Sequence, residues 1–118
     1  MPKVRLHALG RSWEVEVPLG TTILAASKQG GAPEGDACGG VCACSTCHVY
    51  VTAGGELLSE AEEKEEDILD KAFDVQMGSR LGCQARLERD GLVECTITRE
   101  SLDAFYNEHP DAKDPRKG

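Results

Sequence analysis

Alternating apolar and polar positions open the chain and predict two strands. In residues 3–9 (KVRLHAL) and 13–18 (WEVEVP), apolar side chains recur at every second position, which is the period of a half-buried strand. The three residues between these runs (GRS, 10–12) are enough for a tight turn. We therefore expect an N-terminal β-hairpin.

The pattern then changes to that of a short helix. Residues 20–31 (GTTILAASKQGG) begin with threonines that can cap a helix and continue with Ile23, Leu24 and Ala26. Gly30 and Gly31 provide a glycine exit. Residues 31–47 form a long glycine-rich stretch, and loops of that length in compact domains are usually functional. The strand HVYV (48–51) follows.

Helical periodicity returns in residues 57–73 (LLSEAEEKEEDILDKAF). Ser59 and Glu62 have the spacing of a capping box, with serine at the N-cap and glutamate three residues later. At 3.6 residues per turn, the helix has one apolar side and one acidic side. The apolar side comprises Ala61, Ile68, Leu69 and Ala72, and the acidic side comprises Glu63, Glu66, Asp67 and Asp70.

The last third of the chain predicts a closing pair of strands. In residues 79–88 (SRLGCQARLE) a cysteine stands just before a strand, and residues 91–97 (GLVECTI) give a second strand, paired to the first through residues 89–91. From Asn107 the composition turns polar, so we expect the tail to fray. The elements predict an α+β fold with a mixed sheet. Residues 1–106 form the domain and residues 107–118 a polar, flexible C-terminal tail.

The charge limits the possible partners. The 118 residues carry a formal net charge of −8. Nucleic acids and anionic membranes are therefore poor partners, whereas a basic protein surface is a good one. The sequence contains no apolar run of transmembrane length, and MPKVRLHALG resembles neither a signal peptide nor a transit peptide. We expect a monomer in the bacterial cytoplasm, or in the mitochondrial matrix if the chain is processed.

Four of the six cysteines lie within residues 38–47. Cys38, Cys44 and Cys47 have the spacing C-x5-C-x2-C, and Cys83 lies far downstream. In a reducing compartment such thiols bind metal or do redox work more often than they form disulfides. A four-cysteine zinc site usually has two C-x2-C knuckles, and this chain has one. The wide, small-residue loop favours a [2Fe–2S] cluster, around which backbone N–H groups must approach the sulfurs. Zinc remains an alternative.

The segments CGGVCACSTCH (38–48) and SRLGCQ (79–84) resemble the adrenodoxin-type [2Fe–2S] ferredoxins, and the likeness extends from about residue 3 to about residue 99. The resemblance implies a β-grasp ferredoxin fold with a long cluster-binding loop. It also implies one [2Fe–2S] cluster held by Cys38, Cys44, Cys47 and Cys83. Such a protein is a one-electron carrier, reduced by an NAD(P)H-dependent flavoprotein ferredoxin reductase. It is not an enzyme, and the sequence shows neither a catalytic triad nor a dinucleotide-binding glycine motif.

The acidic stripe has two interpretations. Carboxylates on an exposed helix are usually only a solvated face, but residues 60–71 account for −5 of the net charge of −8. A concentrated patch steers a basic partner toward it. The segment EEDILDKAF (65–73) is also similar to the family's partner-binding helix. The resemblance assigns docking of the reductase and the electron acceptor to Asp67 and Asp70, with Glu63 and Glu66 in support.

The remaining candidates are mostly structural. We expect Cys95 to be a small buried hydrophobe. His48 resembles a family histidine that ties the cluster loop to the core. Cys42 is either a small loop residue or, by resemblance, the extra cysteine of ferredoxins that serve iron–sulfur cluster assembly. At Thr98 many family members have proline, which leaves the path of the tail open. Phe105 and Tyr106 either dock on the domain or contact partners.

Three functional hypotheses follow. The first is an electron carrier that serves iron–sulfur cluster assembly, which Cys42 and the length of the tail favour. The second is a carrier that serves a cytochrome P450 or another monooxygenase. The third is a zinc-stabilised interaction module.

Overall fold

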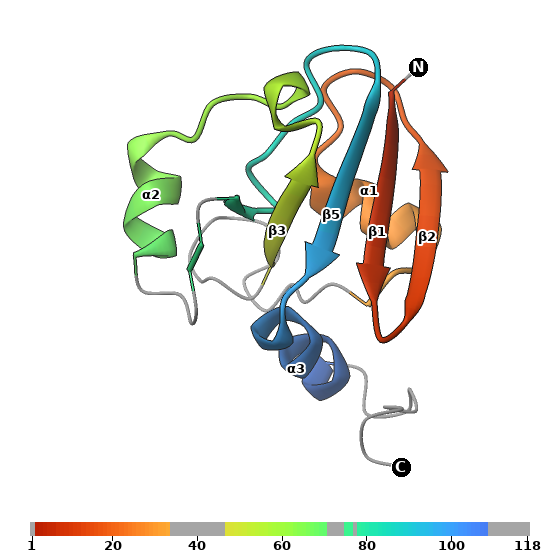
Figure 1. The fold of residues 1–118 in the computed structure, drawn as a ribbon. Helices are drawn as coiled ribbons and strands as arrows, with labels where there is room; N and C mark the ends of the chain where they lie inside the picture. Colours follow the sequence, from red (N-terminus) through yellow and green to blue (C-terminus); the bar gives the residue numbers. More distant parts are fainter. Residues whose placement is uncertain (1, 34–46, 71–74, 77, 109–118) are drawn as a thin grey trace.

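A computed structural model describes residues 2–33, 47–70, 75–76 and 78–108. In this part of the chain, five strands form one mixed sheet in the order β2-β1-β5-β3-β4 (Figure 1). The strands are β1 (Lys3–Ala8), β2 (Arg11–Glu16), β3 (His48–Ala53), β4 (Ser79–Leu81) and β5 (Leu92–Ile97). Three short helices accompany them, namely α1 (Ile23–Gly30), α2 (Glu63–Leu69) and α3 (Arg99–Glu108), together with a 3-10 turn, η1 (Gly55–Leu57). The expected α+β architecture with a mixed sheet is confirmed.

The N-terminal hairpin is confirmed, with a tighter turn than expected. Ala8 pairs with Arg11, so only Leu9 and Gly10 connect the strands, and β2 begins two residues earlier than predicted. Both connecting residues have positive φ, 56° and 73°. Two-residue hairpin loops favour this geometry because its twist matches that of the flanking strands.

Helix α1 follows its sequence signals closely. The Thr22 side chain accepts a hydrogen bond from the Ala25 amide at 3.1 Å, and Gly31 ends the helix in the left-handed conformation with φ 75°. Ile23 and Ala26 are buried against the sheet. The threonine cap and the glycine exit were therefore predicted correctly.

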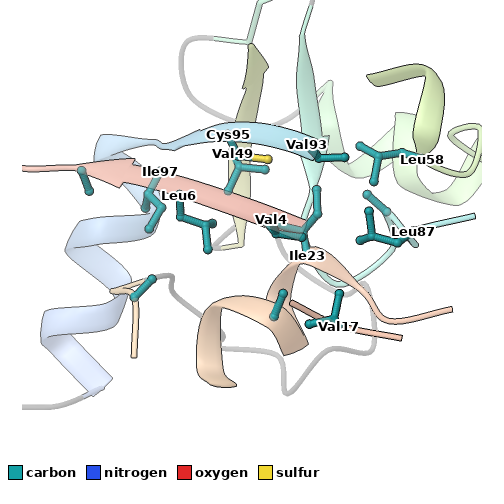
Figure 2. Packing of buried hydrophobic residues seen from close by; sticks show 14 of the residues in the cluster. Val4, Leu6, Val17, Ile23, Val49, Leu58, Leu87, Val93, Cys95 and Ile97 are labelled. Atoms are coloured by element: carbon teal, nitrogen blue, oxygen red, sulfur yellow. The ribbon is translucent and has the colours of Figure 1, made fainter. Parts of the chain in front are cut away.

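The main core lies between α1 and one face of the sheet (Figure 2). Along β1 and β5 every second residue is buried, as the strand period requires. These strands contribute Val4, Leu6, Val93, Cys95 and Ile97, and β3 adds Val49. Arg5, Glu14 and Glu94 lie on the opposite face, where they form ion pairs at 2.8 and 3.2 Å.

The predicted closing hairpin is wrong. β5 pairs in parallel with β1 and antiparallel with β3. The strand next to Cys83 comes before it, as β4, and pairs with β3. Residues 85–87 instead bond to the segment around Thr21–Ile23, with Ala85 O accepting from the Ile23 amide and the Leu87 amide donating to Thr21 O. Residues 85–87 therefore connect to the segment that leads into α1. The last strand, β5, occupies the centre of the sheet.

The predicted capping box is also wrong. α2 begins at Glu63, and its N-cap, Glu62, makes no side-chain cap bond. Ser59 pairs with Arg86 through two hydrogen bonds, Ser59 N to Arg86 O at 2.8 Å and Arg86 N to Ser59 Oγ at 3.1 Å. The serine is therefore used to join two distant segments. α2 ends at Leu69, with Asp70 as its C-cap. The last three residues of the predicted helix, 71–73, lie outside the described ranges.

Helix α3 was not predicted. Thr98 precedes it and accepts a hydrogen bond from the Ser101 amide at 3.2 Å, which is the geometry of an N-cap. Leu102 is buried in the main core, and Tyr106 packs against it. The helix includes Asn107 and Glu108, the first two residues of the predicted tail. Residues 109–118 lie outside the described residues.

Candidate functional site

Cys47 and Cys83, two of the four predicted cluster ligands, lie next to each other. Cys47 directly precedes β3, Cys83 follows β4 by two residues, and the two strands pair with His48 opposite Leu81. The Gly82 amide donates to Cys47 O at 2.9 Å, and the Cys83 amide donates to Cys47 Sγ at 3.5 Å. Antiparallel pairing thus brings together two thiols that are 36 residues apart in sequence.

The surroundings of these two sulfurs are apolar. Cys47 is 1% exposed and Cys83 7% exposed, in a second hydrophobic cluster that includes Leu24 of α1, Leu69 of α2 and Leu81 of β4. The Leu24 amide also donates to Gly82 O at 2.9 Å, which fixes the ligand segment to α1. The two cysteines are not joined in a disulfide.

N–H groups point at both sulfurs. The Cys83 amide is the donor to Cys47, and the Gln84 side-chain Nε2 lies 3.5 Å from Cys83 Sγ. Thiolates that bind an iron–sulfur cluster carry negative charge, which N–H donors stabilise in a partly buried site. The described half of the site therefore fits such a cluster. Cys38 and Cys44, the other two predicted ligands, and Cys42 lie outside the described residues.

Cys95 is separate from this pair. It is fully buried in β5, in the main core, where it lies opposite Leu6 of β1 and Val51 of β3 (Figure 2). The expectation of a small buried hydrophobe is confirmed.

His48 connects the start of β3 to two other elements. Its ring is fully buried, and Nε2 lies 2.7 Å from Ser79 Oγ of β4. Its carbonyl oxygen accepts a hydrogen bond from Thr98 Oγ1 at 2.8 Å. His48 is therefore a buried structural residue, as expected. The tie that it makes to the cluster loop stays a prediction, because residues 34–46 lie outside the described ranges. The sequence did not reveal Thr98 as its partner, although a threonine before Glu100 and Leu102 is a recognisable helix start.

The predicted acidic stripe is exposed as expected. Its four carboxylates, on α2 and its C-cap, all face solvent: Glu63, Glu66, Asp67 and Asp70. On the other side of α2, Leu69 belongs to the cluster that surrounds Cys47 and Cys83. One short helix therefore contributes Leu69 to the apolar cluster of Cys47 and Cys83 and presents its carboxylates to solvent.

Glu65 is a structural residue that sequence reasoning missed. It is 2% exposed, and its carboxylate binds Arg80 through Nε at 2.6 Å and Nη2 at 3.1 Å. It also accepts the Leu81 amide at 3.0 Å. The available signal was its spacing, since position 65 lies one turn before Leu69 on the apolar side of the helix. A carboxylate there requires a buried partner.

No helix within the described ranges is long and apolar enough to span a bilayer.

Comparison with known proteins assigns the chain to a protein family. Residues 6–88 match the family model described as a 2Fe-2S iron-sulfur cluster binding domain. A 2Fe-2S ferredoxin of Escherichia coli is 44% identical over 79 residues, which cover 67% of this chain and 71% of that protein.

Two solved structures agree with the observed architecture. An ISC-like [2Fe-2S] ferredoxin (FdxB) from Pseudomonas putida superimposes with a TM-score of 0.75 at 41% identity, covering 84% of this chain and 94% of that one. In the covalent complex of putidaredoxin reductase with putidaredoxin, the matching chain gives a TM-score of 0.68 at 31% identity, covering 80% and 96%. The expected β-grasp ferredoxin fold is confirmed.

Proposed function

Because this chain belongs to the adrenodoxin-type [2Fe–2S] ferredoxins, we propose that it carries single electrons from an NAD(P)H-dependent flavoprotein reductase to the machinery of iron–sulfur cluster assembly. Membership itself establishes an electron-transfer protein with one [2Fe–2S] cluster, and not an enzyme. The zinc-stabilised module that the cysteine spacing left open is therefore set aside. The donor, the acceptor and the ligand set are our proposals.

The proposed ligands are Cys38, Cys44, Cys47 and Cys83. The observation that supports this set is the contact between Cys47 and Cys83, in which the amide of one ligand donates to the sulfur of the other. The bound cluster supplies the site that is oxidised and reduced. The protein contributes the thiolates, the N–H donors that stabilise their charge, and the apolar shell from α1, α2 and β4 that limits contact with water.

Matched serine variants test the ligand set. Cys83→Ser should lose the visible spectrum and much of the fold, because ligand binding is coupled to folding. Cys95→Ser, at the buried non-ligand cysteine, should keep a normal visible and EPR spectrum. A normal spectrum for Cys83→Ser, or a colourless Cys95→Ser protein, would contradict the assignment.

The proposed docking surface for both redox partners consists of Glu63, Glu66, Asp67 and Asp70. Two observations support it. The carboxylates are exposed on a helix whose Leu69 packs with Cys47 and Cys83. The Glu65–Arg80 pair fixes that helix to β4, so the charges are held in place. In one solved complex, a structurally similar protein, putidaredoxin, is joined to its reductase.

Charge removal tests the docking surface. Asp67→Asn with Asp70→Asn should slow reduction by the reductase several-fold at low ionic strength and much less at high salt, because steering by surface charge is screened. The midpoint potential should stay nearly unchanged. The matched control is Asp90→Asn, an exposed aspartate in the turn before β5. Equal rates for the double variant and wild type across ionic strength would eliminate the docking assignment.

The acceptor requires a comparison of two reactions. The similarity to a ferredoxin described as ISC-like supports cluster assembly. A cytochrome P450 or another monooxygenase is the second candidate, because the same cluster and acidic helix would serve it. Cysteine-desulfurase-dependent cluster synthesis and P450 turnover should be measured with the same reduced protein. Faster support of P450 turnover would reverse our order of preference.

We place the protein as a monomer in the bacterial cytoplasm or the mitochondrial matrix.

A further inference from the structure

Gln84 makes a side-chain contact with the sulfur of a proposed ligand. Its Nε2 lies 3.5 Å from Cys83 Sγ, whereas the Cys83 N–H that donates to Cys47 Sγ is a backbone amide. A backbone donor is present whatever the side chain, whereas the Gln84 donor depends on residue identity. We propose that Gln84 raises the midpoint potential of the cluster by donating this hydrogen bond.

The backbone of Gln84 is held from two directions. Its amide donates to Leu81 O at 3.0 Å, and its carbonyl oxygen accepts from Ser59 Oγ at 3.4 Å. Ser59 is itself bonded twice to Arg86. The glutamine therefore starts from a fixed backbone position, and Ser59, the serine once expected to cap α2, is a positioning residue for it.

The sign of the effect follows from charge. Reduction adds one electron to the cluster and increases the negative charge on its sulfur ligands, while no proton leaves Gln84. An N–H dipole aimed at a ligand sulfur stabilises the reduced form more than the oxidised form. Removal of the donor should therefore shift the midpoint potential to a more negative value. Gln84 is only partly buried, so some solvent stabilisation remains in the variant.

The experiment compares three variants of the full-length, cluster-loaded protein. Gln84→Leu removes the donor. Gln84→Asn keeps a polar amide but shortens the side chain by one methylene, which moves the donor away from the sulfur. Gln76→Leu, at an exposed glutamine just before β4, is the matched control. Midpoint potentials are measured by redox titration followed by EPR.

We expect Gln84→Leu and Gln84→Asn to shift in the same negative direction by similar amounts, and Gln76→Leu to match wild type. An exchangeable-proton coupling in the ENDOR spectrum of the reduced protein should also be lost in both Gln84 variants. Unchanged potentials would overturn the proposal. A shift in Gln84→Leu alone would overturn it too, since local polarity and not the hydrogen bond would then be the cause.

This inference rests on the proposed ligand Cys83, and the two can fail separately. If Cys83→Ser keeps the cluster, the ligand assignment fails and the inference with it. If that variant loses the cluster but both Gln84 variants have the wild-type potential, only the role of Gln84 is refuted.

Discussion

Substitution of the buried carboxylate of α2 is the sharpest test of how the site is held. Glu65→Ala removes two hydrogen bonds to Arg80 and one from the Leu81 amide. The guanidinium, whose side chain is 15% exposed, and a backbone N–H then lose their acceptor. Loss of one partner from a buried ion pair costs about 3–5 kcal/mol. The lower end, about 3 kcal/mol, applies here because Arg80 retains some contact with water.

The change should be measured as an apparent melting temperature at one fixed scan rate. Unfolding of the loaded protein is coupled to loss of its cluster, so the transition is not treated as two-state. For a two-state domain of this size, 1 kcal/mol corresponds to roughly 4 °C, and this conversion is used only to set the scale of the expected shift. Glu65→Ala should therefore melt roughly 10–15 °C below wild type. The visible absorbance of the cluster is the signal by which melting is recorded.

The control is Glu63→Ala, the same substitution two residues away on the exposed side of the same helix. It should stay within about 0.5 kcal/mol of wild type. A double variant, Glu65→Ala with Arg80→Ala, should lose less than the sum of the single changes, because no charge is left without a partner. If Glu65→Ala had the same apparent melting temperature as Glu63→Ala, the Glu65–Arg80 pair would not be what fixes α2 to β4.

Two further changes probe other parts of the fold. Thr98→Val removes the cap of α3 and the donor to His48 O, so it should cost about 2 kcal/mol in thermal denaturation, whereas Thr96→Val on the partly exposed side of β5 should cost little. The pKa of Glu94 is lowered by its hydrogen bond with His7 and then by Arg5. A lowered carboxyl pKa gives stability that is fully present above the unfolded value, about 4.3, and is lost as pH falls through the folded value. Glu94→Gln should therefore reduce the fall in melting temperature between pH 6 and pH 3, and an unchanged slope would refute this linkage.

The sequence by itself determined what depends on neighbouring residues. The hairpin, the Thr22 cap and the Gly31 exit of α1 arise from residues a few positions apart, and all three are present. Cys95, which the sequence led us to expect as a small buried hydrophobe, lies in the core on the buried side of β5. The cysteine spacing and its resemblance gave the family, because cluster ligation demands particular residue types at particular intervals.

Only the tertiary structure decided which distant segments meet. Strand pairing depends on register across the whole sheet, so the sequence could not show that β5 lies between β1 and β3, or that residues 85–87 leave the sheet to contact the start of α1. The same holds for single side chains. Ser59 and Glu65 have local patterns typical of a cap and a solvated acid, yet each bonds to a segment 15 to 27 residues away. Buried polar groups must find partners, and the fold, not the local pattern, determines which partners are within reach.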